Sequence, residues 1–590
     1  MYSTVFTISE FLDFSKKSWI KILIIHTTKV MNDMPNPSQI KAWENSYDVL
    51  KEQFLNISYH KNTYLIFEYE LKRERGRRPD VLLLSGNTVY VLEFKQHNTY
   101  SQAQIDQADA YARDIKNYHK KSHELIIKPL LILTGSNTLR KKVKNVTIVS
   151  KDKLASGFKN QLLTPFCMEI ENWYDSVYEA LPSTIQAASF YFNNQKLPDI
   201  KKAKSAKIPE TINTIKNIIS NNNKYNLILI TGIPGAGKTL VGLNFVHNSR
   251  KATFLSGNGP LISVLQYILK DKTFVQDIHG FLNTYINSSE LPNEDVIIFD
   301  EAQRIWDQEH VILKKRGNLS EAAQIISIAE KKEHFTIVAL IGEGQEIHLG
   351  EESGIKIWDN AINNTNSKEW NIFGSIKIKD YFRKNYIVKD NLHLKISLRT
   401  HCAIMVQDFV TSILDNNISK AKDIFLKLDQ EQYPLYITRS LNIAKKYVKD
   451  RYSNELEKTY GLLASSKGFH LKNIGVDNRF GKQPSAPIYF STPSNFHYCR
   501  NLNSCVTEFS CQGLELDFPI ICWDNDFLYN NTWIDTNPNK KAKDSFKLRK
   551  NTYRVLLTRA RDGMIIFIPN NNKFDTTYNF FKSIGLKYFD

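Results

Sequence analysis

One short glycine-rich stretch constrains the fold of this chain more than any other feature. Residues 232–239 read GIPGAGKT, after the apolar run NLILI at 226–230 and before the helical pattern LVGLNFVHNS. A strand, a glycine loop and a helix N-terminus in this order form the context of a phosphate-binding loop. The glycines let backbone N–H groups converge on phosphate oxygens, and the helix dipole adds favourable potential. The stretch therefore predicts a nucleoside triphosphate site on an α/β sheet.

The loop also predicts individual roles. Lys238 should reach the β- and γ-phosphates, and Thr239 should place its hydroxyl on Mg²⁺. The residues expected to line the nucleotide are Gly232, Pro234, Gly235, Ala236, Gly237, Lys238, Thr239 and Leu240.

A second buried strand supplies the acidic partner of this loop. The run VIIF at 296–299 delivers Asp300 and Glu301 at its C-terminal end, which is where ligands of open α/β sheets bind. We expect Asp300 to hold Mg²⁺ and Glu301 to act as the general base that polarises the attacking water. An acidic pair after a strand is otherwise common on loops, but the phosphate loop upstream favours the functional interpretation.

Composition limits the class of protein. The 590 residues are enough for three or four domains, and 42% apolar residues is ordinary for a globular chain. Lys plus Arg outnumber Asp plus Glu by 78 to 61, and the net charge of +17 suits a nucleic-acid partner, although a basic but inert surface has the same balance. Four of the six cysteines fall within 499–522, but their spacing does not match paired zinc ligands, so reduced, buried thiols are expected.

No apolar stretch is long enough to cross a bilayer. The longest near the start, WIKILII at 19–25, contains Lys21 and does not have the length of a spanning helix. It does not match a signal peptide either. The sequence therefore predicts a soluble, cytoplasmic protein without a membrane partner.

The order of predicted elements divides the chain into three domains. Residues 1–195 contain a helix at 37–54, strands at 63–71, 80–84 and 88–95, and a helix at about 101–119. Residues 196–209 are polar, basic and punctuated by proline, which is typical of a linker. Beyond it strands alternate with helices, which indicates two α/β domains with parallel sheets, at 210–400 and 401–590.

The second half of the chain resembles superfamily 1 helicases of the bacterial Schlafen group 3 DNA/RNA helicase type. Beyond the phosphate loop and DEAQ, the resemblance rests on motifs in order, at 254–266, 341–352, 396–401, 507–517 and 553–563. It implies two RecA-like domains, ATP as the nucleotide, and a motor on DNA or RNA. It further implies roles at the γ-phosphate for Gln345, Arg399 and Arg559, and nucleotide-linked roles for Gln512, Gly513 and Glu515.

Two departures from the helicase pattern bear on activity. No glutamine upstream of the phosphate loop stands out as a reader of adenine, so ATP over GTP rests on the resemblance. The short intervals between motifs leave little room for accessory domains, so translocation is a safer expectation than strand separation. A nucleotide-dependent switch that binds nucleic acid without moving along it stays open, as do an oligomer and a partner protein.

Residues 80–95, DVLLLSGNTVYVLEFK, carry a second chemical signature. Glu93 and Lys95 share one face of a strand, and Asp80 begins the preceding strand of a hairpin. Two converging carboxylates can hold Mg²⁺, which activates a water and offsets the charge of a scissile phosphate. The pattern resembles the PD-(D/E)XK nuclease motif and implies an N-terminal restriction-endonuclease-like α/β domain, in which Gln107 matches the family's glutamine.

The second signature has competing explanations. The pattern E-x-K arises easily by chance, and Glu70-Leu71-Lys72 is another instance. A domain that binds DNA without cutting it fits the same residues. For the first acid of the site, Glu70 is slightly favoured over Glu68 and Glu44. The basic GRR at 76–78 could grip phosphate. Fusion of such a nuclease to a motor also implies a role in defence against phage.

Overall fold

The structure is a computed structural model of the 590-residue chain. It describes residues 3–31, 34–71, 77–178, 208–221, 224–232, 235–249, 251–270, 274–342, 354–364, 369–383, 385–395, 402–479, 481–540, 542 and 544–589. The chain divides into two compact units, which are described separately below. The first consists of Met1–Ala180 and Lys445–Lys458, and the second of Leu181–Ala444 and Thr459–Asp590.

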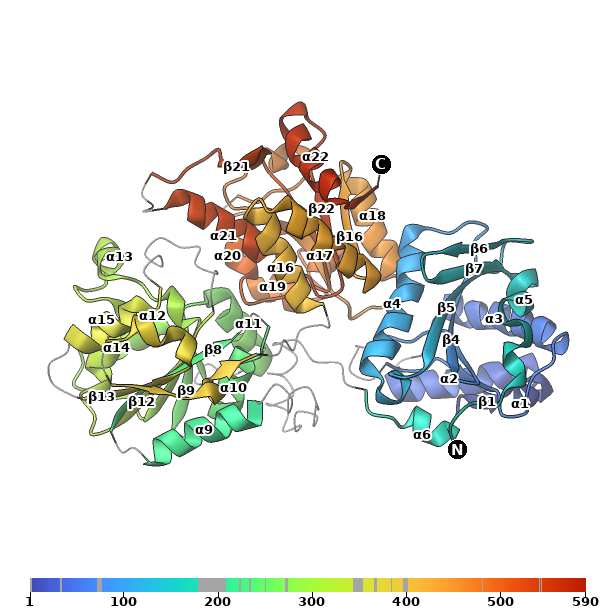
Figure 1. Ribbon diagram of the computed structural model, residues 1–590, viewed down its shortest axis with the longest axis horizontal. Coiled ribbons are helices and arrows are strands. Elements are labelled where there is room, and N and C mark those ends of the chain that lie inside the picture. Colours follow the sequence, from blue (N-terminus) through green and yellow to red (C-terminus); the bar gives the residue numbers. More distant parts are fainter. Residues whose placement is uncertain are drawn as a thin grey trace. The chain divides into compact units, whose positions relative to one another are not determined.

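A mixed sheet forms the centre of the first unit (Figure 1). Its described strands run in the order β1-β2-β3-β4-β5-β7-β6; β4, β5 and β7 are parallel, and the outer pairs are antiparallel. The strands are β1 (Val5–Thr7), β2 (Tyr64–Phe67), β3 (Val81–Ser85), β4 (Thr88–Lys95), β5 (Ile126–Leu133), β6 (Arg140–Val143) and β7 (Val146–Ser150). The helices are α1 (Ile8–Asp13), α2 (Lys16–Met31), α3 (Pro37–Leu55), α4 (Gln102–Tyr118), α5 (Leu154–Phe158) and α6 (Ile170–Tyr174).

Alternating side chains of this sheet pack against helices on its two faces. Leu65 and Phe67 belong to the core beneath α1, α2 and α3, whereas the intervening Ile66 packs with residues of α4 on the other face. Successive side chains of a strand point to opposite faces, so a buried sheet needs apolar residues at consecutive positions. The predicted hairpin is confirmed, with Ser85 opposite Thr88, and so is the helix predicted at 101–119.

The second unit contains two sheets whose described strands are all parallel. The first runs in the order β10-β9-β11-β12-β8-β13-β14, and β15 pairs in parallel with the last residues of β8. Its strands are β8 (Tyr225–Gly232), β9 (Ala252–Ser256), β10 (Val275–Asp277), β11 (Val296–Asp300), β12 (Phe335–Leu340), β13 (Trp370–Gly374), β14 (Tyr386–Val388) and β15 (His393–Leu394). Its helices are α9 (Ile208–Asn221), α10 (Lys238–His247), α11 (Gly259–Leu269), α12 (Ile278–Tyr285), α13 (Gln308–Leu313), α14 (Glu321–Ala329) and α15 (Lys356–Asn364).

Helices cover both faces of this first parallel sheet, as the apolar strand β8 requires. Ile228 and Ile230 pack into the core that includes α9 and α10, while Leu227 and Leu229 face α12, α14 and α15 (Figure 1). The carboxyl ends of β8 and β11 lie at the same edge, separated by β12. This edge is where the predicted nucleotide residues emerge.

The second parallel sheet runs in the order β18-β17-β19-β22-β16-β23, beside the hairpin β20-β21. Its strands and the hairpin are β16 (Leu435–Thr438), β17 (Tyr460–Ala464), β18 (Cys505–Thr507), β19 (Phe518–Cys522), β20 (Phe527–Asn530), β21 (Thr532–Asp535), β22 (Met564–Phe567) and β23 (Lys587–Phe589). The helices are α16 (Ala403–Leu414), α17 (Ile418–Gln430), α18 (Leu441–Arg451), α19 (Ala486–Ser491), α20 (Glu508–Cys511), α21 (Ser545–Leu557) and α22 (Asp575–Ile584). Two helix-covered parallel sheets confirm the α/β class predicted for this part of the chain. Across the described ranges, no helix has the length and apolar character needed to cross a membrane.

Candidate functional site

The phosphate loop connects β8 to α10 at the carboxyl edge of the first parallel sheet. Gly237 sits at the N-cap of α10 with φ 87°, a left-handed conformation that favours glycine. A Cβ on Gly232 would lie 2.7 Å from the Leu394 carbonyl oxygen, so the strand β15 leaves room only for glycine there. Pro234 lies outside the described residues. Gly232 and Gly237 thus occupy positions that favour glycine, which is compatible with a loop whose backbone approaches phosphate.

Thr239 and Asp300 meet at this edge although they come from different elements. The Thr239 hydroxyl donates to both carboxylate oxygens of Asp300, at 3.3 Å to Oδ1 and 3.2 Å to Oδ2. Burial, and then the neighbouring Glu301 carboxylate, raise the pKa of Asp300. A hydroxyl and a carboxylate are the hard oxygen ligands of a Mg²⁺ whose other positions are filled by phosphates and water. The pair therefore fits the expected metal.

Lys238 is turned toward its own loop. Its ammonium group donates to the Gly232 carbonyl oxygen at 2.9 Å. Binding of a triphosphate at this loop requires the ammonium group to exchange this carbonyl for phosphate oxygens.

The general-base candidate Glu301 is held by a residue that the sequence reasoning missed. Glu301 has φ 55°, a left-handed conformation that is uncommon for a residue with a side chain and typical of functional sites. The Gln303 amide nitrogen donates to Glu301 Oε2 at 2.5 Å, and Gly342 N donates to Gln303 Oε1 at 2.8 Å. Gln303, 2% exposed, thus joins the carboxylate to the end of β12. In the sequence, only the position of Gln303 within the DEAQ motif indicated a role for it.

Of the residues predicted from the later motifs, the structure describes some and not others. Gln345 and Arg399 lie outside the described residues. Gln512 is buried, and its carbonyl oxygen accepts a hydrogen bond of 2.9 Å from the side chain of Asn258, the N-cap of α11. Glu515 is 3.7 Å from Arg561.

The neighbouring Gly513 fits the same junction tightly. It has φ 75°, and a Cβ on it would lie 2.5 Å from Asn258 Nδ2. The junction between Asn258 and the Gln512–Gly513 peptide joins the two parallel sheets of the second unit.

Arg559 is held within its own domain. It is 2% exposed, and its guanidinium donates to the carbonyl oxygens of Val555 at 2.9 Å and Leu514 at 3.4 Å. Its predicted contact with the γ-phosphate stays a prediction, and it requires the guanidinium to leave these carbonyls.

In the first unit, Asp80, Glu93 and Lys95 come together as the sequence predicts. Phe94 N donates to Asp80 Oδ2 at 2.7 Å, which places the aspartate beside the end of β4. The Lys95 ammonium group donates to Glu93 Oε1 at 2.8 Å. Burial, and then mutual repulsion between the two carboxylates, raise the pKa of Glu93. These two carboxylates raise the pKa of Lys95 despite the opposing effect of its burial.

The structure places Glu68, and not the slightly favoured Glu70, beside the other residues of this site. Glu70 is exposed, whereas Glu68 is buried, accepts a 2.8 Å hydrogen bond from Trp43 Nε1, and raises the pKa of Asp80 by charge repulsion. The strand β2 ends before both residues, and Glu68 takes a left-handed φ of 51°. The alternation of a strand therefore could not decide between them. Glu44, the third alternative, is exposed.

Gln107 belongs to α4, on the helix face that also carries Tyr111 one turn later. It is 1% exposed, and neither of its amide atoms has a hydrogen-bond partner among the described residues. The same holds for Glu93 Oε2. Buried polar atoms without partners are rare and call for a water, an ion or a ligand. The donor set of two carboxylates and an amide fits a hydrated Mg²⁺, although no group of three acidic, histidine or cysteine side chains in the described ranges is arranged to hold a metal.

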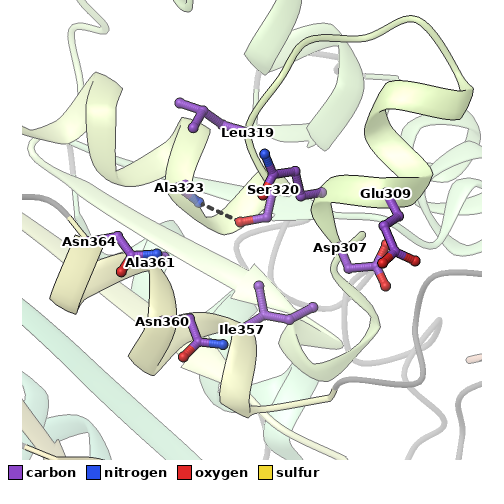
Figure 2. Close-up of a pocket in the computed structure, with 10 residues that line it drawn as sticks. Asp307, Glu309, Leu319, Ser320, Ala323, Ile357, Asn360, Ala361 and Asn364 are labelled. Carbon is purple, nitrogen blue, oxygen red and sulfur yellow. Dashed lines mark hydrogen bonds between the residues drawn. The ribbon is translucent and has the colours of Figure 1, made fainter.

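A pocket of about 330 Å³ lies elsewhere in the second unit, between the N-terminal ends of α13 and α14 and the helix α15. Figure 2 shows Asp307 and Glu309 on one side of it and Asn360 on the other, with Ser320 accepting from Ala323 N at the start of α14. The described residues that line this pocket include acids but no Lys, Arg or His. It therefore does not suit a triphosphate.

The comparison with protein families decides the class of the second unit. The model of a family described as Schlafen group 3, DNA/RNA helicase domain matches residues 225–570. The chain belongs to this family. The Schlafen group 3 match begins at the first residue of β8 and extends past β22, so it includes the phosphate loop and strands of both parallel sheets. It does not reach the Asp80–Lys95 site.

Two solved structures extend the comparison. The Pif1 helicase from Bacteroides in complex with ADP-AlF3 and ssDNA is 12% identical, with a TM-score of 0.33, over 63% of this chain and 96% of that chain. A variant of S. cerevisiae Dbp5 bound to RNA and ADP BeF3 is 11% identical, with a TM-score of 0.28, over 69% of this chain and 94% of that chain. No curated protein matches the chain.

Proposed function

We propose that this protein is an ATP-driven nucleic-acid motor that carries a Mg²⁺-dependent DNA endonuclease. The motor rests on one observation above all: Thr239 of the phosphate loop and Asp300 of β11 share hydrogen bonds beside Glu301, within a Schlafen group 3 DNA/RNA helicase domain. The net charge of +17 suits a nucleic-acid track.

Each residue of the nucleotide site has a defined part in hydrolysis. When bound, Mg²⁺ neutralises charge on the phosphates. Lys238 binds the β- and γ-phosphates, and Thr239 and Asp300 hold the metal. Glu301 accepts the proton of the attacking water, and Gln303 fixes the direction of its carboxylate. Arg399 and Arg559 complete the γ-phosphate environment from beyond the loop, so that hydrolysis moves the two parallel sheets relative to each other.

The nuclease rests on Asp80, Glu93 and Lys95 converging beside unpartnered polar atoms. When bound, Mg²⁺ at this site activates a water and offsets the charge of a scissile phosphate. Asp80 and Glu93 hold the metal, Lys95 orients the nucleophile, and Gln107 and Glu68 support the site from α4 and the end of β2. The conjunction of motor and nuclease in one chain favours a role in defence against foreign DNA.

Two sets of variants test the two activities separately. Glu301→Gln keeps the size of the side chain but removes the base, and ATP turnover should fall by at least about a hundred-fold. Glu309→Gln, an exposed residue of the same fold, is the control. Wild-type turnover should rise with single-stranded DNA or RNA. A motor is ruled out if no nucleic acid stimulates hydrolysis, and the nucleotide-dependent switch is then correct.

The nuclease test uses plasmid DNA with Mg²⁺. Asp80→Ala and Lys95→Ala should each abolish cleavage while leaving ATP turnover unchanged. If cleavage persists in both variants, it belongs to another site. If the wild-type protein binds DNA but never cleaves it, the first unit is a binding domain.

A further inference from the structure

One stretch of the chain belongs to a different unit from its neighbours on both sides. Lys445–Lys458 is part of the first unit, whereas the strands β16 before it and β17 after it belong to the second parallel sheet of the second unit. The stretch includes the last turns of α18 and the loop that follows. It is therefore tied at both ends to the helicase domain.

The stretch lies against α4 through buried polar contacts. The Tyr447 hydroxyl donates to Asp106 Oδ2 at 2.5 Å, and Arg451 Nη1 donates to the Tyr447 hydroxyl at 3.2 Å. The same guanidinium is 3.8 Å from Asp106. Glu455 forms an ion pair of 2.8 Å with Arg77 Nε. The Arg77, Arg451 and Glu455 side chains are each 2% exposed.

Arg77 connects this contact to the candidate nuclease site. It precedes Asp80 by three residues, its guanidinium lies 4.9 Å from the centre of the Tyr111 ring, and it also pairs with Asp114 of α4. Tyr111 is one turn from Gln107 on α4. Glu455 therefore pairs with Arg77, and Arg77 joins the segment before Asp80 to the face of α4 that carries Gln107.

The groups of the candidate nuclease site are buried in the structure that contains this contact. Glu93 and Gln107 are each 1% exposed, and the Lys95 side chain is 11% exposed. A phosphodiester has to reach the Mg²⁺ and the water that these groups would hold, so the site has to open. An arginine beside a nuclease site binds backbone phosphate well, because its planar fork matches phosphate and carboxylate oxygens alike. The Glu455 carboxylate pairs with the Arg77 guanidinium, as a DNA phosphate would.

The chemistry of the contact suits a reversible role. Buried ion pairs recover little more than the desolvation cost of their charges, whereas apolar packing stabilises permanent contacts. Polar contacts within a chain resemble transient interfaces between proteins. The contacts described above are made by the hydroxyl group of Tyr447 and the charged groups of Arg451 and Glu455.

We propose that Lys445–Lys458 is an autoinhibitory latch, in which Glu455 occupies Arg77 and keeps the carboxylate–lysine site closed to DNA. The latch rests on the proposed nuclease function. Because the helicase domain holds both ends of the stretch, movement of that domain releases Arg77 and opens the site.

Glu455→Gln in the 590-residue chain tests the latch, because it removes the charge and keeps the size of the side chain. Loss of the ion pair with Arg77 should shift the equilibrium toward the released state by about ten-fold, which corresponds to about 1.4 kcal/mol. We expect cleavage of plasmid DNA with Mg²⁺, without ATP, to rise about ten-fold. The control is Glu457→Gln, at an exposed position of the same stretch, which should behave as wild type. If the wild-type protein cleaves DNA, cleavage by Glu455→Gln at or below the wild-type rate overturns the latch.

Two further readouts separate the latch from the nuclease itself. Binding of a fluorescent DNA duplex in EDTA should tighten in Glu455→Gln, and the gain should vanish in the double variant with Arg77→Ala. Hydrogen exchange of Gln102–Tyr118 should be faster in Glu455→Gln than in Glu457→Gln. If no variant cleaves DNA but binding and exchange change as described, the latch holds and the nuclease assignment is wrong. If binding and exchange are unchanged, the latch is wrong whatever the cleavage.

Discussion

Replacing Gln303 by alanine removes a side chain that is bonded at both ends. Gln303 donates to the Glu301 carboxylate at 2.5 Å and accepts from Gly342 N at 2.8 Å, in a position that is 2% exposed. A hydrogen bond to a charged group contributes about 1.5–3 kcal/mol, and losing it frees the Glu301 carboxylate to rotate. If that alignment is needed only in the transition state, kcat for ATP falls about ten- to hundred-fold.

The ratio of kinetic constants distinguishes alignment from nucleotide binding. Neither bond of Gln303 is made to the phosphate loop, so KM for ATP should change by less than about two-fold in Gln303→Ala. Steady-state ATP turnover with saturating single-stranded DNA provides both constants. Gln308→Ala, an exposed glutamine at the start of α13, is the matched control. A Gln303→Ala enzyme with the kcat of wild type, or one whose loss lies wholly in KM, would refute a positioning role.

Three other residues provide independent tests. Thr239→Val removes the hydroxyl beside Asp300, so half-maximal ATP turnover should need about ten-fold more Mg²⁺; an unchanged Mg²⁺ titration would contradict a metal-binding role. Trp43→Phe leaves the buried Glu68 carboxylate without its 2.8 Å donor and should destabilise the first unit by about 1–3 kcal/mol in urea unfolding; Tyr59→Phe, outside this contact, is the control. Burial raises the pKa of Asp109 from 3.8 to about 7, so the folded state keeps a proton that the unfolded state loses, and this residue makes stability fall as pH rises between these values. The stability gained in Asp109→Asn should therefore be larger at pH 8 than at pH 5, and an equal gain at both would show that Asp109 does not titrate in this range.

The sequence predicted the features that depend on short contiguous segments and on simple strand geometry. The phosphate loop is contiguous, and roles for its glycines, Lys238 and Thr239 can be predicted because a strand, a turn and a helix follow one another directly. The position of Asp300 at the same edge as the phosphate loop was predictable because parallel strands of one sheet end at the same edge. The hairpin at Ser85 likewise brought Asp80 beside Glu93 through register alone.

Contacts set by a single backbone angle or by distant segments were not predictable. Glu68 replaces Glu70 because the strand stops and the chain turns left-handed, which no alternation of residues reveals. Gln303 looked like part of a motif, but its bond to Gly342 depends on how β11 and β12 are placed side by side. Glu455 lies in an ordinary polar loop in the sequence, and only the folded chain places it on Arg77.

The insertion of Lys445–Lys458 into the first unit has a consequence for synthesis on the ribosome. Domains generally fold from the N-terminus as the chain emerges. The sheet of the first unit is complete once β7 has left the exit tunnel, yet its last segment follows only after the phosphate loop and most of the helicase strands have been translated. During that interval Arg77 and Asp106 lack their later partners. With the proposed latch, a nascent chain, or one cut short before residue 445, would lack the segment that closes the candidate nuclease site, so the order of translation would determine when that site is closed.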